Sequence, residues 1–297
     1  MEDVDPMEPK HTAATRGREV ALLLPGMTMN RTLFPALGRP TLDLDFTRAA
    51  PPPADPERGP TMDDYVAALD AYLARHADVW DRPLRLVVGH SFGGMLALRW
   101  LLRHGGRGPA EIAALVLVGV SAGPLFRAVR LRLGAGLGRE WRIPLAPVLP
   151  LWNSRVLTRT MKRLTSGGLH GRPQDFRTLR RRSDLAIDLA GWRNTDWRAM
   201  RAFRFALDGY DVRAELPRVH VQTIVLHGTR DSLFPLDEAR RLAAGLPNTE
   251  LRVVAGAGHG LPLTHGDHVV QAVRDIVRRE TGDGGRETRN EKREPSN

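Results

Sequence analysis

The sequence contains no cysteine among its 297 residues, which excludes disulfide bonds, thiolate nucleophiles and cysteine-ligated metals. It has no apolar run approaching the eighteen or so residues that a membrane-spanning helix needs. Its start, Met1–Asp5, is acidic and lacks the apolar segment of a secretory signal. We therefore expect a soluble, cytoplasmic protein. No cluster of metal-ligating residues is visible either, so we expect neither a metal ion nor another cofactor.

Lysine is also scarce: the sequence has three lysines and forty-one arginines. The net charge is +10, and the excess of positive charge lies in residues 124–208, which contain 18 Lys and Arg and 6 Asp and Glu. The rest of the chain contains 26 Lys and Arg and 28 Asp and Glu. Basic segments attract nucleic acids, anionic lipids or acidic substrates. No helix-turn-helix, zinc-finger or RNP-type pattern accompanies these arginines, so we expect no nucleic-acid partner.

What the sequence does contain is 42% apolar residues, enough for a chain of this length to bury one sizeable core. Short apolar runs alternate with amphipathic stretches, and this alternation indicates parallel strands joined by right-handed helical crossovers. We predict an α/β fold with a doubly wound, mostly parallel sheet. The expected strands are Glu19–Leu24, Thr41–Phe46, Leu84–Val88, Ala113–Val120, Thr223–Leu226 and Glu250–Val254. The expected helices cover about residues 61–76, 94–105, 236–244 and 267–279.

Residues 124–208 interrupt this alternation. They show no clear strand, they carry helical apolar stripes at 156–164 and 197–207, and they hold four of the six tryptophans. We expect a helical cap or lid that lies over the carboxyl edge of the sheet, where open α/β sheets bind ligands. The expected organisation is a disordered tail (1–18), a core (19–123 and 209–280), the cap (124–208) and a second disordered tail (281–297).

A nucleophile motif follows the buried strand at 84–88. The sequence Gly89-His90-Ser91-Phe92-Gly93, with a further Gly94, has the G-x-S-x-G pattern and lies between a strand and a helix. Small flanking residues are needed because the serine of such a motif occupies a strained turn. The turn raises the hydroxyl above the sheet edge, beside the N-terminus of a helix that stabilises negative charge. Ser91 is therefore the expected nucleophile.

A serine hydroxyl needs a base, and the base needs a carboxylate that orients it. Among ten histidines, His259 lies in the glycine-rich loop after the last predicted strand, and Asp231 lies in the loop after the strand before it. The chain order Ser, Asp, His is the order expected of this arrangement. We expect His227, His265 and His268 to be structural. His90 adjoins Ser91 and is expected to shape the pocket, because it cannot readily fold back onto its neighbour's hydroxyl.

Acyl transfer also needs two N–H donors for the negatively charged oxygen of the tetrahedral intermediate. The first is expected to be the backbone N–H of Phe92, directly after the nucleophile. The second is expected to be the backbone N–H of Met27, in the loop after the first strand that begins Pro25-Gly26. The two side chains would then line the pocket for the acyl group.

These residues together resemble the α/β-hydrolase superfamily, over about residues 19–280. The resemblance implies that Ser91 is the nucleophile, Asp231 the orienting acid and His259 the base. The sequence departs from the family pattern in two ways. The frequent His-Gly before the oxyanion loop is Pro25-Gly26 here, and the first two family strands have no clear counterpart before Glu19. The sheet is therefore expected to have six strands.

The leading hypothesis is a serine hydrolase that cleaves a carboxylic ester of a small or medium apolar acyl group through an acyl-enzyme. Its expected partner is a small-molecule ester or thioester. An acyl thioesterase uses the same triad, and a non-catalytic small-molecule receptor could retain the same scaffold. Residues 125–133 are basic and partly amphipathic, a pattern found in interfacial membrane helices. We favour a cap helix over peripheral membrane contact for this segment.

Overall fold

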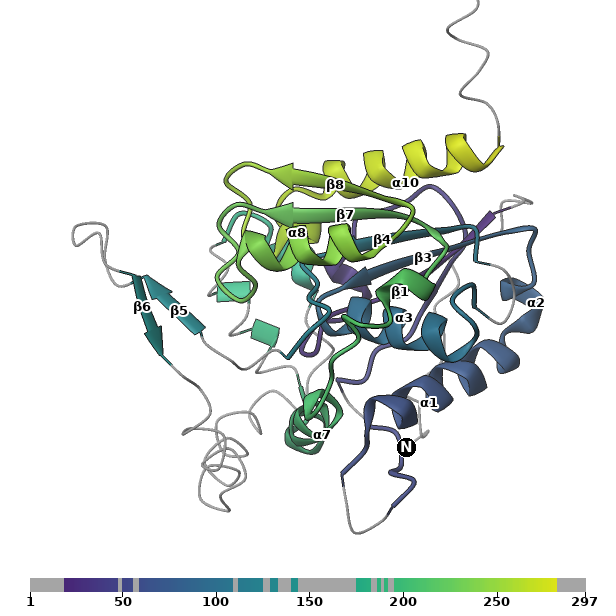
Figure 1. The fold of residues 1–297 in the computed structure, drawn as a ribbon, viewed down its shortest axis with the longest axis horizontal. Helices are drawn as coiled ribbons and strands as arrows, with labels where there is room; N and C mark the ends of the chain where they lie inside the picture. Colours follow the sequence, from purple (N-terminus) through teal and green to yellow (C-terminus); the bar gives the residue numbers. More distant parts are fainter. Residues whose placement is uncertain are drawn as a thin grey trace, which may run out of the picture.

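The computed structural model describes residues 19–47, 50–55, 59–108, 112–124, 129–132, 140–143, 175–182, 186–187, 190–191 and 195–281. Its centre is a six-stranded sheet with the strand order β2-β1-β3-β4-β7-β8, in which every neighbouring pair is parallel (Figure 1). The strands are β1 (Glu19–Leu24), β2 (Thr41–Asp43), β3 (Leu84–His90), β4 (Ala114–Val118), β7 (Gln222–Gly228) and β8 (Thr249–Val254). The predicted six-stranded α/β sheet is confirmed.

Helices cover both faces of this sheet (Figure 1). On one face, α1 (Met62–Arg75), α3 (Phe92–Arg103) and α8 (Leu236–Gly245) bury their apolar sides in one large cluster. On the other face, α10 (Gly266–Thr281) packs Val269, Val273 and Ile276 against β4 and β7. The short elements are α2 (Ala77–Trp80), α9 (Leu261–Thr264), η1 (Arg31–Leu33), η2 (Phe176–Leu179) and η3 (Leu216–Arg218).

The helix boundaries follow from local sequence chemistry. Thr61 and Asp64 form a capping box at the start of α1, each side chain accepting from the backbone N–H of the other residue. The predicted strand from Thr41 ends early, at Asp43, because Asp45 turns the chain. Its carboxylate accepts hydrogen bonds from the backbone N–H and hydroxyl of Thr47, and such local bonds compete with the strand ladder.

The parallel register aligns the carboxyl ends of the strands. Leu24 of β1 is opposite Gly89 of β3, and His90 of β3 is opposite Val118 of β4. Gly228, the last residue of β7, is opposite Val254, the last residue of β8. The loops that follow β1, β3, β7 and β8 therefore leave from one edge of the sheet, where ligands bind in open α/β folds.

The expectation that residues 124–208 contain no strand is wrong. Val129–Arg132 (β5) and Glu140–Ile143 (β6) form an antiparallel pair, separate from the main sheet. The sequence Val-Arg-Leu-Arg alternates strictly between apolar and polar residues, which is the period of a strand rather than of a helix. The amphipathic helix expected at 125–133 is therefore replaced, over its described part, by a strand.

The second apolar stripe of this segment forms the predicted helix, α7 (Trp197–Leu207). The stripe at 156–164 lies outside the described residues, as do the predicted tail at 1–18 and residues 282–297 of the predicted tail at 281–297. Thr281, the first residue of that predicted tail, is the last residue of α10. Within the described part of the chain, no helix is both long and apolar enough to cross a membrane.

Candidate active site

Ser91 occupies a sharp turn between β3 and α3. Its backbone has φ 52° and ψ −121°, and among the described residues it is the one non-glycine residue with positive φ. A residue with a side chain is strained in this backbone conformation, which favours glycine. The turn is tight because α3 starts directly against the end of β1. A Cβ on Gly93 would lie 2.0 Å from the carbonyl oxygen of Leu24. The glycine of the motif is therefore required by close packing of backbone on backbone.

Asp231 and His259 form a buried pair at the same edge of the sheet. Nδ1 of His259 lies 2.8 Å from Oδ2 of Asp231, and the two side chains are 5% and 1% exposed. Backbone bonds hold their loops together, because the Arg230 N–H donates to the Ala257 carbonyl at 2.8 Å. Gly119, after β4, adjoins the pair, since a Cβ there would lie 3.2 Å from both bonded atoms. Residues from three strand ends thus meet at this point.

The environment of Asp231 keeps its carboxylate ionised. Burial acts to raise the pKa of this carboxyl group. The adjacent His259 opposes burial through its charge and its hydrogen bond, and His227 and the Phe234 N–H contribute further, so that the pKa lies below its ordinary value. Oδ1 accepts from the backbone N–H groups of Leu233 and Phe234, both at 2.9 Å. Oδ2 is therefore left to hold His259 in one orientation.

His90 connects the serine turn to the histidine loop. Its Nε2 donates to the backbone carbonyl of His259 at 2.9 Å, and the two ring centroids are 4.8 Å apart. Burial and the neighbouring His259 lower the pKa of His90 to about 3, so its ring is neutral. Since Ser91 follows His90 directly, this contact ties the loop that carries His259 to the turn that carries Ser91. This contact could not be predicted from the sequence, because no local pattern indicates a hydrogen bond between residues 169 positions apart.

The loop after β1 lies next to Ser91. A Cβ on Gly26 would be 2.9 Å from Nδ1 of His90 and 3.3 Å from Cβ of Ser91. Met27 follows in this loop, and Phe92 is the first residue of α3, where a helix has no carbonyl to accept its N–H. Within the described residues, neither N–H donates to a backbone carbonyl. The two expected oxyanion donors thus flank Ser91, one in the loop after β1 and the other at the start of α3.

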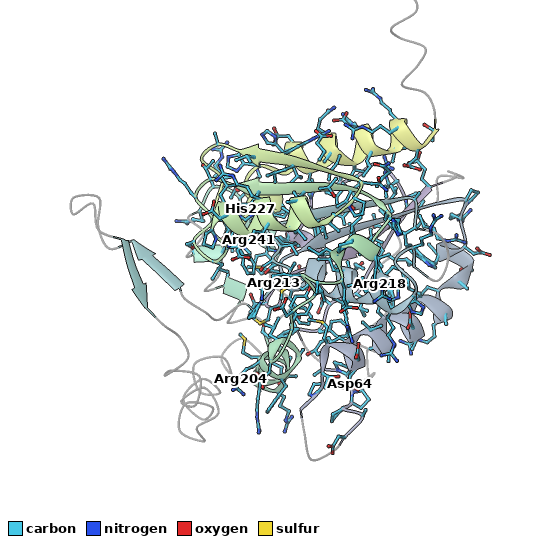
Figure 2. The ribbon with its side chains drawn as sticks, in the orientation of Figure 1. Asp64, Arg204, Arg213, Arg218, His227 and Arg241 are labelled. Carbon is cyan, nitrogen blue, oxygen red and sulfur yellow. The ribbon has the colours of Figure 1, made fainter. Side chains whose placement is uncertain are left out.

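Two other described histidines, His227 and His265, use a ring nitrogen for hydrogen bonds outside the His259–Asp231 pair. Nε2 of His227 donates to the Phe234 carbonyl at 2.9 Å, and burial lowers the pKa of its ring. Figure 2 shows His227 near the carboxyl end of β7, where it supports the loop that carries Asp231. Nδ1 of His265 bonds to the Thr264 hydroxyl at 2.9 Å. No group of three potential ligand side chains that could hold a metal ion occurs among the residues that the structure describes.

Part of the inserted segment contacts this edge of the sheet. Phe203 of α7 packs edge-to-face on Phe92, with ring centroids 4.8 Å apart, and stacks on Tyr65 of α1 at 5.8 Å. A Cβ on Gly191 would lie 2.6 Å from Oγ1 of Thr28 in the loop after β1. Two described parts of residues 124–208 therefore touch the loops around Ser91.

Comparison with known proteins agrees with this geometry. Residues 51–266 match the family described as the alpha/beta hydrolase fold. The chain is 29% identical over 234 residues to a pimeloyl-[acyl-carrier protein] methyl ester esterase of Aromatoleum aromaticum, which covers 75% of this chain and 82% of that protein. It is 28% identical over 221 residues to a 2-hydroxymuconate semialdehyde hydrolase of Pseudomonas putida, covering 71% and 66% of the two chains.

Solved structures show the same fold. The esterase RhEst1 from Rhodococcus sp. ECU1013 superposes with a TM-score of 0.61 at 18% identity, over 91% of this chain and 93% of that one. The family match spans well over half of the residues, and the strand order and the turn at Ser91 agree with it. The chain therefore belongs to the alpha/beta hydrolase fold family, and its relatives include esterases.

Proposed function

We propose that this protein is a serine hydrolase that cleaves a carboxylic ester of a small or medium apolar acyl group through an acyl-enzyme. The observation that carries the proposal is the buried pair of His259 and Asp231, with Nδ1 and Oδ2 2.8 Å apart, at the sheet edge where Ser91 occupies its strained turn. A hydrogen bond through Nδ1 leaves Nε2 of His259 as the proton acceptor for a hydroxyl.

In the acylation step, Nε2 of His259 takes the proton of the Ser91 hydroxyl while Oγ attacks the ester carbonyl carbon. The carbonyl oxygen becomes an oxyanion, which the N–H groups of Met27 and Phe92 stabilise. As the tetrahedral intermediate collapses, the C–O bond to the alcohol breaks, and the alcohol leaves with the proton from His259. The ionised carboxylate of Asp231 stabilises the imidazolium that forms between the two transfers.

In the deacylation step, His259 takes a proton from a water molecule, whose oxygen attacks the acyl carbon. The bond to Ser91 Oγ breaks, the serine recovers its proton from His259, and a carboxylic acid is released. The two steps together consume one ester and one water and release one alcohol and one carboxylic acid, so they require no oxidant or reductant. His259 is neutral at the start of each step, so kcat/KM falls as pH decreases through the pKa of the base.

We assign the cap role to residues 124–208. The contacts of Phe203 with Phe92 and of Gly191 with Thr28 support it, because both bring the inserted segment against the loops that flank the nucleophile. Phe92 and Met27 are then expected to contact the acyl group on one side, and α7 to limit the space on the other. An apolar acyl group fits this aromatic surrounding better than a polar one.

Turnover of p-nitrophenyl esters of graded chain length tests this proposal. Ser91→Ala should lower kcat/KM by about a thousandfold or more, because nucleophile and base act as one unit. The variant should keep the parent's stability, since the turn is shaped by glycines and the change removes one oxygen atom. Residual activity within about tenfold of the parent, at equal purity, would contradict the role of Ser91.

Ser121→Ala is the matched control. Ser121 is also buried and follows β4 at the same edge of the sheet, but its hydroxyl faces Glu238 Oε2 at 3.3 Å rather than the histidine loop. This variant should keep the parent's activity. Turnover of thioesters in preference to esters would instead identify an acyl thioesterase. Tight binding of esters without turnover would identify a receptor on the hydrolase scaffold.

A further inference from the structure

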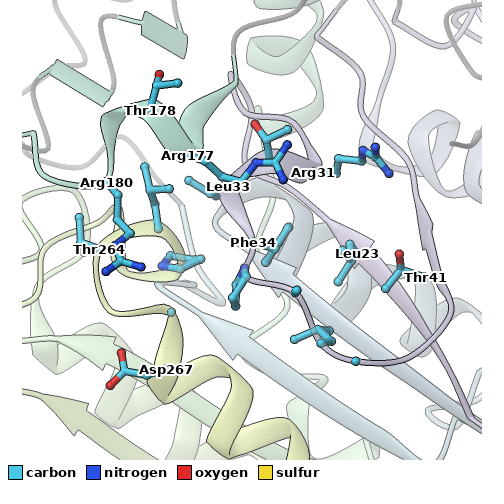
Figure 3. Close-up of a pocket in the computed structure, with 18 of the residues that line it drawn as sticks. Leu23, Arg31, Leu33, Phe34, Thr41, Arg177, Thr178, Arg180, Thr264 and Asp267 are labelled. Carbon is cyan, nitrogen blue, oxygen red and sulfur yellow. The ribbon is translucent and has the colours of Figure 1, made fainter. Parts of the chain in front are cut away.

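A cleft of about 1300 Å³ lies outside the catalytic residues (Figure 3). Its walls come from η1 and the chain that follows it to the first residue of β2 (31–41), from η2 and the turn after it (177–181), and from α9 with the start of α10 (262–267). Ser91, Asp231 and His259 are not among its lining residues. The volume exceeds the range of about 300–1,000 Å³ that is usual for small-molecule sites, so the cleft has room for a ligand of its own.

The floor of the cleft is apolar. Leu23, Leu33 and Phe34 lie along it (Figure 3), and Leu37 and Leu263 are also among its lining residues. All five side chains are at most 9% exposed and belong to the protein core. A cleft floored by such residues favours a ligand with an apolar part, because binding removes that part from water.

The rim of the cleft is strongly basic. Five arginines line it, against one acidic residue, Asp267. Three of the five have acidic partners: Arg39 pairs with Glu19, Arg31 with Asp43, and Arg177 with Asp175.

The other two, Arg180 and Arg181, are exposed. No carboxylate of the described chain lies within ion-pair distance of either. Arg177 and Arg180 flank the hollow on the side away from Leu23 and Thr41 (Figure 3). Two guanidinium groups without a carboxylate partner among the described residues, next to that of Arg177, form a surface that complements a phosphate or carboxylate.

We propose that this cleft binds an amphipathic anion, with a phosphate or carboxylate head group at Arg180 and Arg181 and an alkyl chain along Phe34 and Leu23. The arginines alone would attract any anion, and the floor alone would attract any apolar molecule. Their combination in one cleft selects a ligand that carries both parts. Asp267 repels the head group from the α10 end and so directs it to η2. The proposed ligand is a single monomeric amphiphile rather than a membrane surface.

The test uses n-dodecyl phosphate and sodium dodecanoate, below the concentrations at which they form micelles. Binding to the Ser91→Ala protein is measured by calorimetry, so that the result does not depend on the proposed hydrolysis. Both amphiphiles should bind with a dissociation constant at least tenfold lower than that of inorganic phosphate or of n-dodecanol. Equal binding of n-dodecanol would overturn the assignment of a charged head group.

Location is tested with an alkyl phosphate that carries a photoreactive diazirine at the end of its chain. Cross-links should map to peptides that contain residues 31–41 or 262–267. Arg180→Gln/Arg181→Gln should lower affinity and cross-linking about tenfold or more, which is the usual effect of losing charge-assisted bonds. The control Arg240→Gln/Arg241→Gln removes two neighbouring exposed arginines from α8, with the same change in net charge, and should have no effect.

Two results would overturn the proposal. One is cross-linking confined to peptides around Ser91 and Met27, which would place the amphiphile in the acyl pocket. The other is sedimentation of the protein with phosphatidate vesicles without binding of the monomeric alkyl phosphate, which would make the arginines a membrane contact. A fall in affinity for n-dodecyl phosphate as salt increases from low to high concentration supports it.

Discussion

His90 shows how much one buried side chain contributes to the geometry of this site. It precedes Ser91, donates to the backbone carbonyl of His259 at 2.9 Å, and packs against Gly26 in the loop after β1. Its Nε2 must carry the proton, because the acceptor is a carbonyl oxygen. Its Nδ1 is buried without a hydrogen-bond partner among the described residues. A neutral ring is therefore favoured, and a second cation next to His259 is avoided.

This burial has a consequence for stability. The pKa of His90 is lowered from 6.5 to about 3, so between these pH values the unfolded chain binds one proton more than the folded protein. The contribution of His90 to stability is complete above about pH 6.5 and is lost as pH decreases towards 3. His90→Gln keeps a side-chain N–H donor of similar reach and removes the titration.

We predict that the free energy of unfolding falls more steeply in the parent than in His90→Gln, by up to about 1.4 kcal/mol per pH unit between pH 6 and pH 4. Urea denaturation of both proteins across this range measures the two slopes. Asp231 and the other carboxylates titrate in both proteins and cancel in the comparison. Parallel slopes would contradict the assignment of a buried neutral ring to His90.

At the scale of single elements, the turn between β3 and α3 depends on contact between backbones. The Cβ of an alanine at position 93 would meet the carbonyl oxygen of Leu24 at 2.0 Å, and a backbone atom cannot rotate away as a flexible side chain can. We predict that Gly93→Ala lowers the free energy of unfolding by about 1–3 kcal/mol or more and lowers ester turnover with it, because the oxyanion loop must shift.

Gly105→Ala is the control for this variant. Gly105 has φ +75° but open space around its Cα, so alanine there should cost only about 1 kcal/mol of left-handed strain and leave turnover unchanged. Thermal unfolding and p-nitrophenyl ester assays on the two variants give the comparison. Equal stability losses would show that close packing at Gly93 does not shape the turn.

The central strands of the sheet could be predicted from sequence, because β1, β3, β4 and β7 each contain a continuous apolar run followed by turn residues. The predicted start of β1 and the strand–turn–helix context of Ser91 match the structure for this reason. The short strand β5 could not be predicted, because its apolar–polar alternation covers only four residues within the longer amphipathic pattern of residues 125–133, which indicated a helix. Asp231 and His259 could be proposed from chain order, whereas their 2.8 Å contact depends on the strand order of the folded sheet.

At the scale of the whole molecule, α7 connects the inserted segment to the core. Phe203 contacts both Phe92, which follows Ser91, and Tyr65 of α1, and the rings of Phe92 and Tyr65 also contact each other. A smaller side chain at this position should leave more room beside Ser91. We predict that Phe203→Leu shifts the preferred p-nitrophenyl ester towards a longer acyl chain and costs less than about 1.5 kcal/mol of stability. A ladder of esters with increasing acyl length measures the shift.

Leu242→Val is the control for this prediction. Leu242 of α8 belongs to the same buried cluster but packs at its other side, against the β7 and β8 end of the sheet. This variant should lose a similar amount of stability without a change in preferred chain length. A shift of the same size in both variants would remove α7 from substrate selection.

The central claim is that Ser91 is the nucleophile of an acyl-enzyme, and covalent labelling tests it most directly. A fluorophosphonate ester reacts with an activated serine, and the adduct mimics the tetrahedral intermediate. Intact-mass spectrometry of the parent protein should show a single adduct, and peptide mapping should place it on Ser91. His259→Ala should react far more slowly, because the serine then lacks its base. An unlabelled parent protein, or an adduct on a serine other than Ser91, would contradict the claim.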